Sequence, residues 1–399
     1  MGEPRMSLAP PEPKLLSNMN QRSVIRVLQQ HGPCSRADVT RQLGVTAPTV
    51  SKAVASLLAS RFVEEFECKD NAIGRPAKRL RLATQSSQVL GLVIDAEECH
   101  LTAAGLDGEL RSDTACRFPT PKTYRGLLSR VVRQARRLMD QEPIKTLGLG
   151  ISLPGLIDYR RQQGLLSPNV PITNGRSPAQ DLSEQLGVEC VLLQETHALC
   201  IAERHCGDTG SLEDFAMLDM GVGLGLGLVT GGQILTGSSG LAGEIGHIPY
   251  EPAGRLCGCG KRGCLETVAS NSAVAWQVSQ RLDRKLSIEE IIDRVQQGQL
   301  SLEDEWRRLL PALAFALATI INLLNPSTLF VNGRLFDLHD DLLNELRHAA
   351  QQTALQPAVT ACRIVKARGN KQQGAVAGII EHLADTLAPG VHGMLSRQS

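Results

Sequence analysis

The 399-residue sequence predicts a mixed α/β fold in which a small winged helix-turn-helix module precedes a larger body of two α/β lobes. Two observations predict this organisation. First, residues 14–85 follow a three-helix, two-strand pattern and carry 12 Lys and Arg against five Asp and Glu, a net charge of +7, whereas the whole chain is only +1. Second, strands and helices alternate from residue 88 onward over about 300 residues, a pattern typical of α/β layers.

The composition is that of a soluble protein with reduced thiols. The 11 cysteines show no paired framework, which favours a cytosolic compartment. Residues 1–13 are polar and rich in proline, so we expect a disordered tail and no secretory signal. The longest apolar run, Pro311–Leu324, is too short to span a bilayer and predicts a buried helix. We therefore expect a cytoplasmic protein.

The N-terminal module begins with three predicted helices. Residues 15–30 place apolar side chains at helical spacing. Ser35 is positioned as the N-cap of a short helix, Arg36–Leu43, and Thr46 as the cap of a third helix. The inner stripe of that third helix is formed by Val50, Val54, Leu57 and Leu58.

Two short helices joined by a glycine-containing turn form the helix-turn-helix pattern, in which the third helix of this module would enter the major groove of DNA. Its outward residues are small or basic. Two strands follow, 62–67 and 74–82, and the Gly-Arg-Pro at the start of the second places Arg75 at the tip of a wing that could reach a minor groove. The candidate DNA-contacting residues are Arg36, Thr46, Thr49, Ser51, Lys52 and Arg75.

A small three-helix module can also be a protein-interaction domain. The charge of +7 and the Gly-Arg-Pro wing favour a polyanion partner instead. The sequence therefore predicts double-stranded DNA as the partner of residues 14–85.

The body opens with two predicted strands, 89–95 and 99–106, and Asp107-Gly108 predicts a hairpin turn into a third. A polar helix follows at about 123–140. The remaining predicted elements are strands 146–152, 189–193, 214–219, 221–230 and 328–331, a helix at 196–205, and a long helix ending near Asn325. Mixed hairpins and βα units predict two lobes with a binding site between them.

A histidine and three cysteines fall within 18 residues, spaced as His-x9-Cys-x-Cys-x4-Cys. Neighbouring glycines allow the tight turns that such a loop needs. One imidazole and three thiolates are a standard tetrahedral set for structural zinc. Two carboxylates, Glu244 and Glu266, are interleaved with the set, so we expect polar groups that face a pocket. The predicted zinc ligands are His247, Cys257, Cys259 and Cys264.

Four segments together resemble the ROK family, which contains bacterial sugar kinases and sugar-responsive transcriptional repressors. They are Ile151–Asp158, Gly221–Gly225, Ala242–His247 and Cys257–Glu266. The resemblance covers residues 88–390, and the winged helix ahead of it matches the repressor branch. It implies a two-lobed ribonuclease H/actin-like fold with a sugar bound between the lobes.

The same resemblance indicates that ATP use is lost. Kinases of the family carry an Asp-x-Gly-Gly-Thr turn for the ATP phosphates, and the matching stretch here, Asp95–Cys99, holds two glutamates that would repel phosphate. The catalytic aspartate is matched by Glu195, whose extra methylene displaces the carboxylate. A Gly-Gly-Gly near the adenosine is matched by Asn332-Gly333-Arg334. We expect no catalytic residues.

The resemblance implies that the sugar half of the site is retained. His247 would hold zinc with one ring nitrogen and face a sugar hydroxyl with the other. Alternatively, the carboxylates only orient metal ligands. His197 has no partner at ligand spacing, so we expect a surface or packing histidine. The candidate sugar-binding residues are Asn169, Gln194, Glu195, Glu244, His247 and Glu266.

These patterns predict a DNA-binding repressor that works as a homodimer or tetramer, with a sugar or sugar derivative changing the closure of its lobes. Two alternatives remain at this point. One is a sugar kinase that has gained a DNA-binding module. The other is a DNA-binding protein that is regulated by a protein partner rather than by a sugar.

Overall fold

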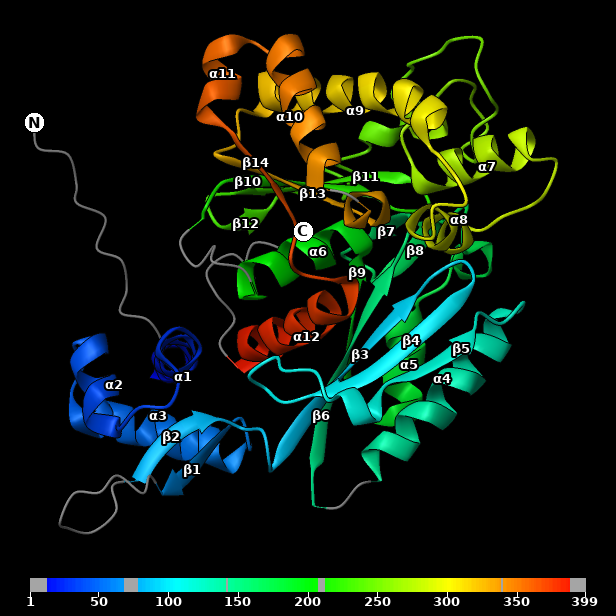
Figure 1. Ribbon diagram of the computed structural model, residues 1–399. Coiled ribbons are helices and arrows are strands. Elements are labelled where there is room, and N and C mark those ends of the chain that lie inside the picture. The colour runs from blue at the N-terminus through cyan, green and yellow to red at the C-terminus, as the bar shows by residue number, and fades with distance from the viewer. Residues whose placement is uncertain (1–12, 68–77, 141–142, 207–211, 339, 388–399) are drawn as a thin grey trace, which may run out of the picture.

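The computed structural model shows an N-terminal module and a body of two lobes (Figure 1). Each lobe of the body contains one five-stranded sheet. The structure describes residues 13–67, 78–140, 143–206, 212–338 and 340–387. The predicted disordered tail therefore lies outside the described residues, apart from Pro13.

The N-terminal module has the predicted order of helices and strands. It consists of α1 (Pro13–His31), α2 (Arg36–Leu43), α3 (Ala47–Ala59), β1 (Val63–Glu67) and β2 (Lys78–Leu82). The two strands pair antiparallel, and apolar side chains of the three helices form the core beneath them.

The two predicted helix caps differ. Ser35 accepts a hydrogen bond from the Asp38 N–H at 3.1 Å, and the Asp38 carboxylate accepts one from the Ser35 N–H at 3.0 Å, which is a capping box. Thr46 occupies the N-cap position of α3, but its hydroxyl bonds to the Thr49 hydroxyl at 2.9 Å and to no backbone N–H. Arg75, the predicted wing tip, lies outside the described residues.

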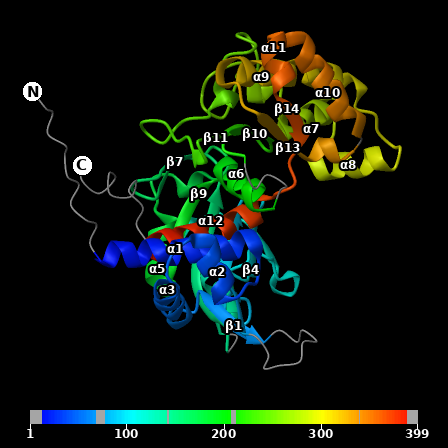
Figure 2. The ribbon, with the colours of Figure 1, turned by 90° about the vertical axis from the view of Figure 1, so that its left-hand side faces the viewer.

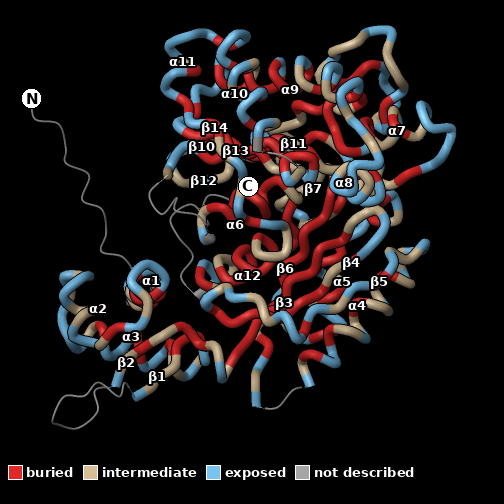
Figure 3. Tube along the Cα trace, viewed as in Figure 1, coloured by how far each residue is buried: buried red, intermediate tan, exposed pale blue. Residues whose placement is uncertain are grey.

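The first lobe is built on a sheet with strand order β5-β4-β3-β6-β9, in which β3, β6 and β9 are parallel. Helices α4 (Tyr124–Met139) and α5 (Pro178–Leu186) share one apolar core with this sheet. Every residue of β3 is buried, as Figure 3 shows. The strands are β3 (Ser87–Ile94), β4 (Glu98–Ala104), β5 (Cys116–Pro119), β6 (Lys145–Leu153) and β9 (Glu189–Gln194).

The third strand begins later than the sequence predicted. The chain does turn at Gly108, where φ is +86°, but β5 starts only at Cys116. Arg111 explains the difference, because its guanidinium donates to the Gln88 side chain at 3.0 Å and to the Thr84 carbonyl at 2.5 Å. The chain pairs briefly with β4 through a bridge between Leu110 and Ala104, but the 3₁₀ turn Ser112–Thr114 then interrupts the pairing until Cys116.

The second lobe is built on a sheet with strand order β12-β11-β10-β13-β14. Its strands are β10 (Phe215–Met220), β11 (Leu224–Thr230), β12 (Gln233–Ile234), β13 (Thr328–Gly333) and β14 (Arg363–Lys366). Its helices are α7 (Asn271–Arg281), α8 (Ile288–Gln296), α9 (Glu303–Leu324), α10 (Asp340–Thr353) and α11 (Gln356–Ala361). A small hairpin, β7 (Leu156–Asp158) and β8 (Gln163–Leu166), follows β6.

Within the described part of the chain, α9 is the one helix whose length and composition would allow it to cross a membrane. Ten of its residues are buried, and its apolar face belongs to the core of the second lobe. The prediction of a buried helix over Pro311–Leu324 is therefore confirmed.

Two helices, α6 (Glu195–Cys206) and α12 (Lys371–Leu387), lie between the two sheets (Figure 1). Glycines allow the close packing here. A Cβ at Gly150 of β6 would lie 1.8 Å from the Ala375 carbonyl oxygen, and one at Gly374 would lie 2.0 Å from that of Ala198. No other residue fits at either position, so α12 packs directly on β6 and on α6.

The N-terminal module shares a core with the body. Helix α1 lies against α12 (Figure 2), and side chains of the module belong to one apolar cluster with Val376 and Ile380 of α12. Arg22 of α1 pairs with Asp385 of α12 at 2.6 Å. The Glu64 carboxylate also accepts hydrogen bonds from the connecting segment 84–86. The division at residues 85–88 remains a prediction, since the packing crosses it.

Candidate functional site

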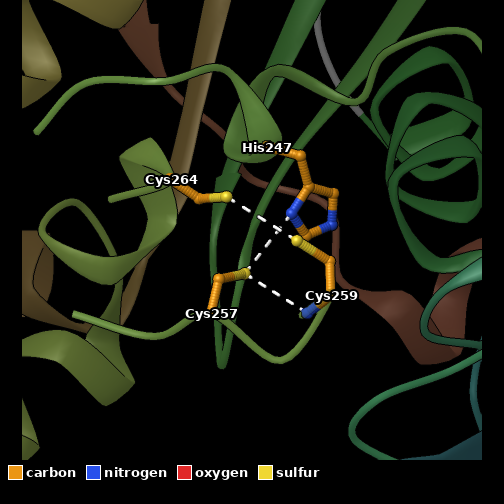
Figure 4. Close-up of side chains that lie close together, drawn as sticks. All are labelled: His247, Cys257, Cys259 and Cys264. Atoms are coloured by element: carbon orange, nitrogen blue, oxygen red, sulfur yellow. Dashed lines mark hydrogen bonds between the residues drawn. The ribbon is translucent and has the colours of Figure 1, made fainter. Parts of the chain in front are cut away.

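The four predicted metal ligands converge on one point (Figure 4). Their ligand atoms all lie within 4.8 Å of one another. The Cys257 Sγ is 3.6 Å from His247 Nδ1, and the Cys259 Sγ is 3.6 Å from the Cys264 Sγ. In a tetrahedral site with a metal–sulfur distance of about 2.3 Å, ligand atoms are about 3.8 Å apart. The set therefore fits a tetrahedral metal ion.

The backbone of the metal loop, residues 248–264, fits this geometry. Gly263 has φ of +67°, and a Cβ there would lie 1.5 Å from the Glu251 carbonyl oxygen. The Cys259 N–H donates to the Cys257 sulfur at 3.4 Å, a bond that favours a thiolate. Burial raises the pKa of the Cys257 thiol, so a bound cation would be needed to keep that sulfur ionised.

Two carboxylates lie beside the metal ligands. Glu266, in a short 3₁₀ turn (Leu265–Thr267), accepts a hydrogen bond from the Cys257 thiol at 2.8 Å. Glu244 lies 3.7 Å from His247 Nε2, the ring nitrogen that does not face the cysteines. Burial raises the pKa of Glu244. His247 therefore turns Nδ1 towards the cysteines and Nε2 towards Glu244, while the bond from Cys257 to Glu266 requires the protonated thiol.

A second polar group, which we call the charge cluster, consists of Asp95, Glu195, Asp219 and Lys371. The Lys371 ammonium lies 2.5 Å from Glu195 Oε2 and 3.4 Å from Asp219 Oδ2. Asp219 is 2% exposed, and its other oxygen accepts a hydrogen bond from the Asn332 side chain at 2.7 Å. Asp95 acts electrostatically on both Glu195 and Lys371. Each residue comes from a different element or strand end, so the site joins both lobes.

Three carboxylates and one ammonium give the charge cluster a formal charge of −2. Burial opposes the charged form of Lys371, but Asp219 and Glu195 outweigh it and raise the lysine's pKa, so this residue is an ammonium ion. Burial also raises the pKa of Glu195, against the opposing effect of Lys371. Glu195 could be identified from the sequence, whereas Asp219 and Lys371 could not, because they carry no spacing motif and stand far apart in the chain.

The predicted strand 221–230 begins only at Leu224, because residues 221–223 form the turn between β10 and β11. This glycine-rich turn brings the metal loop and the charge cluster together. A Cβ at Gly223 would lie 2.7 Å from Glu266 Oε2, and one at Gly221 would lie 3.6 Å from Lys371 Nζ. Two residues of backbone therefore separate the contact with Glu266 from the contact with the cluster. This close approach explains the glycines without any bound nucleotide.

The other two sugar-binding candidates differ in their surroundings. Gln194 is 9% exposed, and its side-chain carbonyl accepts a hydrogen bond from the Thr196 hydroxyl at 2.5 Å. Asn169 is half-buried, and its neighbour Pro168 would lie 3.0 Å from a Cβ at Gly258 of the metal loop. The segment that holds Asn169 thus lies beside the metal loop, whereas the Gln194 side chain, at the end of β9, is bonded to Thr196 of the following helix α6.

His197 is a packing histidine, which is one of the two roles expected for it from the sequence. It is 2% exposed and stacks on Tyr159, whose hydroxyl bonds to His197 Nδ1. The same hydroxyl accepts a hydrogen bond from the Gln194 N–H at 3.0 Å. Burial lowers the pKa of His197 to about 4.

Folding stability should therefore depend on pH through His197. The side chain stays neutral in the folded protein down to about pH 4, whereas in the unfolded chain it takes up a proton near pH 6.5. We expect the free energy of unfolding to fall from pH 7 to pH 4 by up to roughly 3 kcal/mol from this residue. His197→Asn keeps an acceptor for the Tyr159 hydroxyl but cannot titrate, so its free energy of unfolding should fall less between pH 7 and pH 4. Urea unfolding at several pH values measures this dependence. The same pH dependence in both proteins would show that His197 is not the group responsible.

The predicted DNA-contacting residues of α3 lie on its outer surface. Thr46, Ser51 and Lys52 are exposed and Thr49 is half-buried, while Val50 and three other residues of this helix face the core. Lys52 has no ion-pair partner within the described residues. Arg36, by contrast, pairs with Glu65 of β1 at 2.7 Å, and about half of its side chain is exposed.

Two shallow surface hollows lie elsewhere, at the edge of the second sheet. Both are lined by Asp214, Leu324 and Pro326, and neither contains a predicted site residue. The convergence of side chains therefore identifies the candidate site better than the shape of the surface does.

Residues 89–385 match the model of the ROK family, which is well over half of the chain. The chain belongs to the ROK family. Residues 16–69 also match the MarR family, whose match covers the helices and the first strand of the N-terminal module. The resemblance on which the sequence prediction depended is thus confirmed.

Known ROK proteins are similar to the chain over most of their length. The DNA-binding transcriptional repressor Mlc of Escherichia coli (strain K12) is 27% identical over 377 residues, 91% of this chain and 92% of Mlc. The DNA-binding transcriptional dual regulator NagC of the same strain is 24% identical over 363 residues, 88% of this chain and 89% of NagC.

A crystal structure of a ROK family transcriptional regulator, described as a homolog of the E. coli Mlc protein, is similar in fold. The TM-score is 0.79 at 24% identity, and the match covers 94% of this chain and 98% of that one. The predicted fold class, a winged helix-turn-helix followed by a two-lobed actin-like ROK body, is confirmed.

Proposed function

We propose that the protein is a DNA-binding transcriptional repressor whose affinity for DNA is controlled by a sugar or sugar derivative bound between the lobes of its ROK body. One observation carries the proposal: the chain joins an exposed recognition helix with basic and small residues to a ROK body in which Glu244, His247 and Glu266 flank the metal loop. The relatives Mlc and NagC are named as DNA-binding regulators, and they match both parts.

The protein would act as a regulator and not as a kinase. A general base must be free to accept a proton. Glu195, the residue that matches the base of the kinases, is instead bonded to the Lys371 ammonium at 2.5 Å. The test is ATP-dependent phosphorylation of a panel of hexoses. Turnover that Glu195→Gln abolishes would establish the kinase alternative.

The experiment that tests the main proposal is DNA binding by the purified protein. Fragments of its own genome would be tested with and without a panel of sugars and sugar phosphates. A sugar that releases or tightens a specific complex supports the proposal. If DNA binds and no sugar changes it, sugar control is wrong and regulation by a protein partner takes its place.

Helix α12 offers a direct route from the sugar site to the DNA-binding module. It begins at Lys371 in the charge cluster and reaches Asp385, which pairs with Arg22 of α1. A ligand that shifts Lys371 would therefore act on the position of α1. Any such switch requires unequal affinity of the ligand for the two states.

This route predicts a specific uncoupled variant. Asp385→Asn removes the charge that holds Arg22, and an exposed pair of this kind contributes no more than about 1 kcal/mol to stability. We expect unchanged sugar affinity but a sugar effect on DNA affinity reduced by up to about fivefold, which is the same energy expressed as a ratio. Titration calorimetry and DNA binding measure the two quantities. Asp113→Asn, the same change at an exposed site, is the control, and an equal sugar effect in both variants would contradict the route.

We propose zinc as the ion bound by the metal loop, because three sulfurs and one imidazole nitrogen are the ligands that structural zinc takes. We propose a cytoplasmic homodimer that places its two winged modules on half-sites about one helical turn apart. Light scattering of the protein, alone and on operator DNA, distinguishes a dimer from a tetramer.

A further inference from the structure

The charge cluster also bears on which form of a sugar can bind. We infer that the effector is an uncharged sugar and that Asp95, Glu195, Asp219 and Lys371 exclude its phosphate esters. The inference rests on the proposed function, since it names the chemical class of the effector. Its basis is the position of the cluster, which lies against the glycine-rich turn at residues 221–223, beside Glu266, one of the predicted sugar contacts.

The positive charge of the lysine is already balanced by carboxylates. Its ammonium is bonded to Glu195 and also lies within ion-pair distance of Asp219. A phosphate that approached the remaining N–H of Lys371 would lie next to both carboxylates and be repelled by them. The cluster as a whole would still present two unbalanced negative charges to the ligand.

Backbone N–H groups, the usual alternative for binding a phosphate, are also engaged here. The start of a helix such as α12 is a common anion site. In this protein the Gln373 N–H donates to the Asn370 side chain at 2.9 Å. The Arg368 and Gly369 N–H groups both donate to Glu203 at 2.9 Å. The Asn370 N–H also donates, to the Gln373 side chain at 3.0 Å, so four of the N–H groups around the start of α12 are bonded within the protein.

The sugar-facing side adds two more acids. Glu244 and Glu266 lie beside His247, whose Nδ1 faces the cysteines. Arg255 interacts electrostatically with Glu266, but its guanidinium lies over the Trp276 ring, 4.7 Å from the ring centroid. Carboxylates accept hydrogen bonds from sugar hydroxyls. A phosphate, with about −1.5 to −2 charges at pH 7, would be repelled by the same oxygens.

The test compares free sugars with their phosphates on the full-length protein. Titration calorimetry would use glucose, mannose, galactose and N-acetylglucosamine, each beside its 6-phosphate. For a sugar that binds, we expect the 6-phosphate to bind at least tenfold more weakly. Asp95→Asn keeps the hydrogen bond from the Ala96 N–H and removes one charge. It should therefore reduce the ratio of the two dissociation constants, 6-phosphate over free sugar, at least threefold. Asp113→Asn, at an exposed site, should leave the ratio unchanged.

A second variant covers the case in which Asp95→Asn does not fold. Glu195→Gln retains an acceptor for Lys371 and should narrow the ratio in the same way. A ratio that neither variant changes would overturn the role of the cluster.

The outcomes separate this inference from the proposed function. A 6-phosphate that binds as tightly as the free sugar, or more tightly, and alters DNA binding would overturn the inference and leave the repressor proposal in place. If none of the eight compounds binds and DNA binding is indifferent to all of them, sugar control fails, and the inference fails with it.

Discussion

Replacing Cys257 by serine is expected to release the bound metal ion and unfold the metal loop. The backbone hydrogen bonds of this loop, such as Tyr250 N–H to the Gly263 carbonyl and Cys257 N–H to the Lys261 carbonyl, both at 2.8 Å, join the loop mainly to itself. Without the ion, residues 248–264 therefore depend on these internal bonds for their position. Structural zinc contributes about 10–16 kcal/mol in small zinc domains, so we expect a loss of at least ~5 kcal/mol in local stability here.

The loss should extend to function, because Glu266 and His247 would lose their positions together with the cysteines. Metal content, hydrogen exchange of residues 248–264 and sugar-dependent DNA binding measure the three effects. Cys116→Ser is the matched control, since Cys116 is half-buried and lies outside the metal set. A zinc-free Cys257→Ser protein with full thermal stability and a normal sugar response would show that the ion is dispensable.

The second large effect is expected at Lys371. Lys371→Met leaves Glu195 and the almost fully buried Asp219 without their cation. Removing one partner of a buried ion pair costs about 3–5 kcal/mol, because the remaining charge is buried without compensation. We expect a decrease at the low end of this range, since about a fifth of the Lys371 side chain is exposed.

Lys366→Met is the matched control for this variant. Lys366 pairs with Asp337 at 2.7 Å, but both side chains are more than 40% exposed, so its loss should cost less than about 1 kcal/mol. Urea unfolding compares the two variants. The double variant Lys371→Met/Glu195→Gln should recover part of the loss. Equal stability of the two single variants would show that the cluster is not a buried ion pair in solution.

The features that could be predicted from the sequence depend on short stretches of chain. Ser35 was identified as a cap because its partner Asp38 is three residues away. The histidine and three cysteines that the structure brings together were identified because 18 residues contain all four. The start of the third strand was not predicted, since Arg111 reaches back to Gln88 and Thr84. Thr46 was placed correctly, but its hydroxyl found Thr49 instead of the backbone.

The charge cluster shows where sequence reasoning ends. Asp95, Asp219 and Lys371 stand at the ends of separate strands and at the start of the last helix, and each alone is an ordinary polar residue. Only the topology, which runs α12 back between the two sheets, places the lysine between the carboxylates. Glu195 could therefore be identified from the sequence, but its pairing with Lys371 could not.

The core that α1 shares with α12 has a consequence for how proteins of this design diversify. A DNA-binding module joined to the body only by a flexible linker could be exchanged for another module as a unit. Here a transplanted module would lose the contacts of α1 with α12, the Arg22–Asp385 pair among them, and the bonds that Glu64 makes to residues 84–86. New operator preferences should therefore arise through point substitutions on the outer surface of α3, while the helix that rests on the body changes slowly.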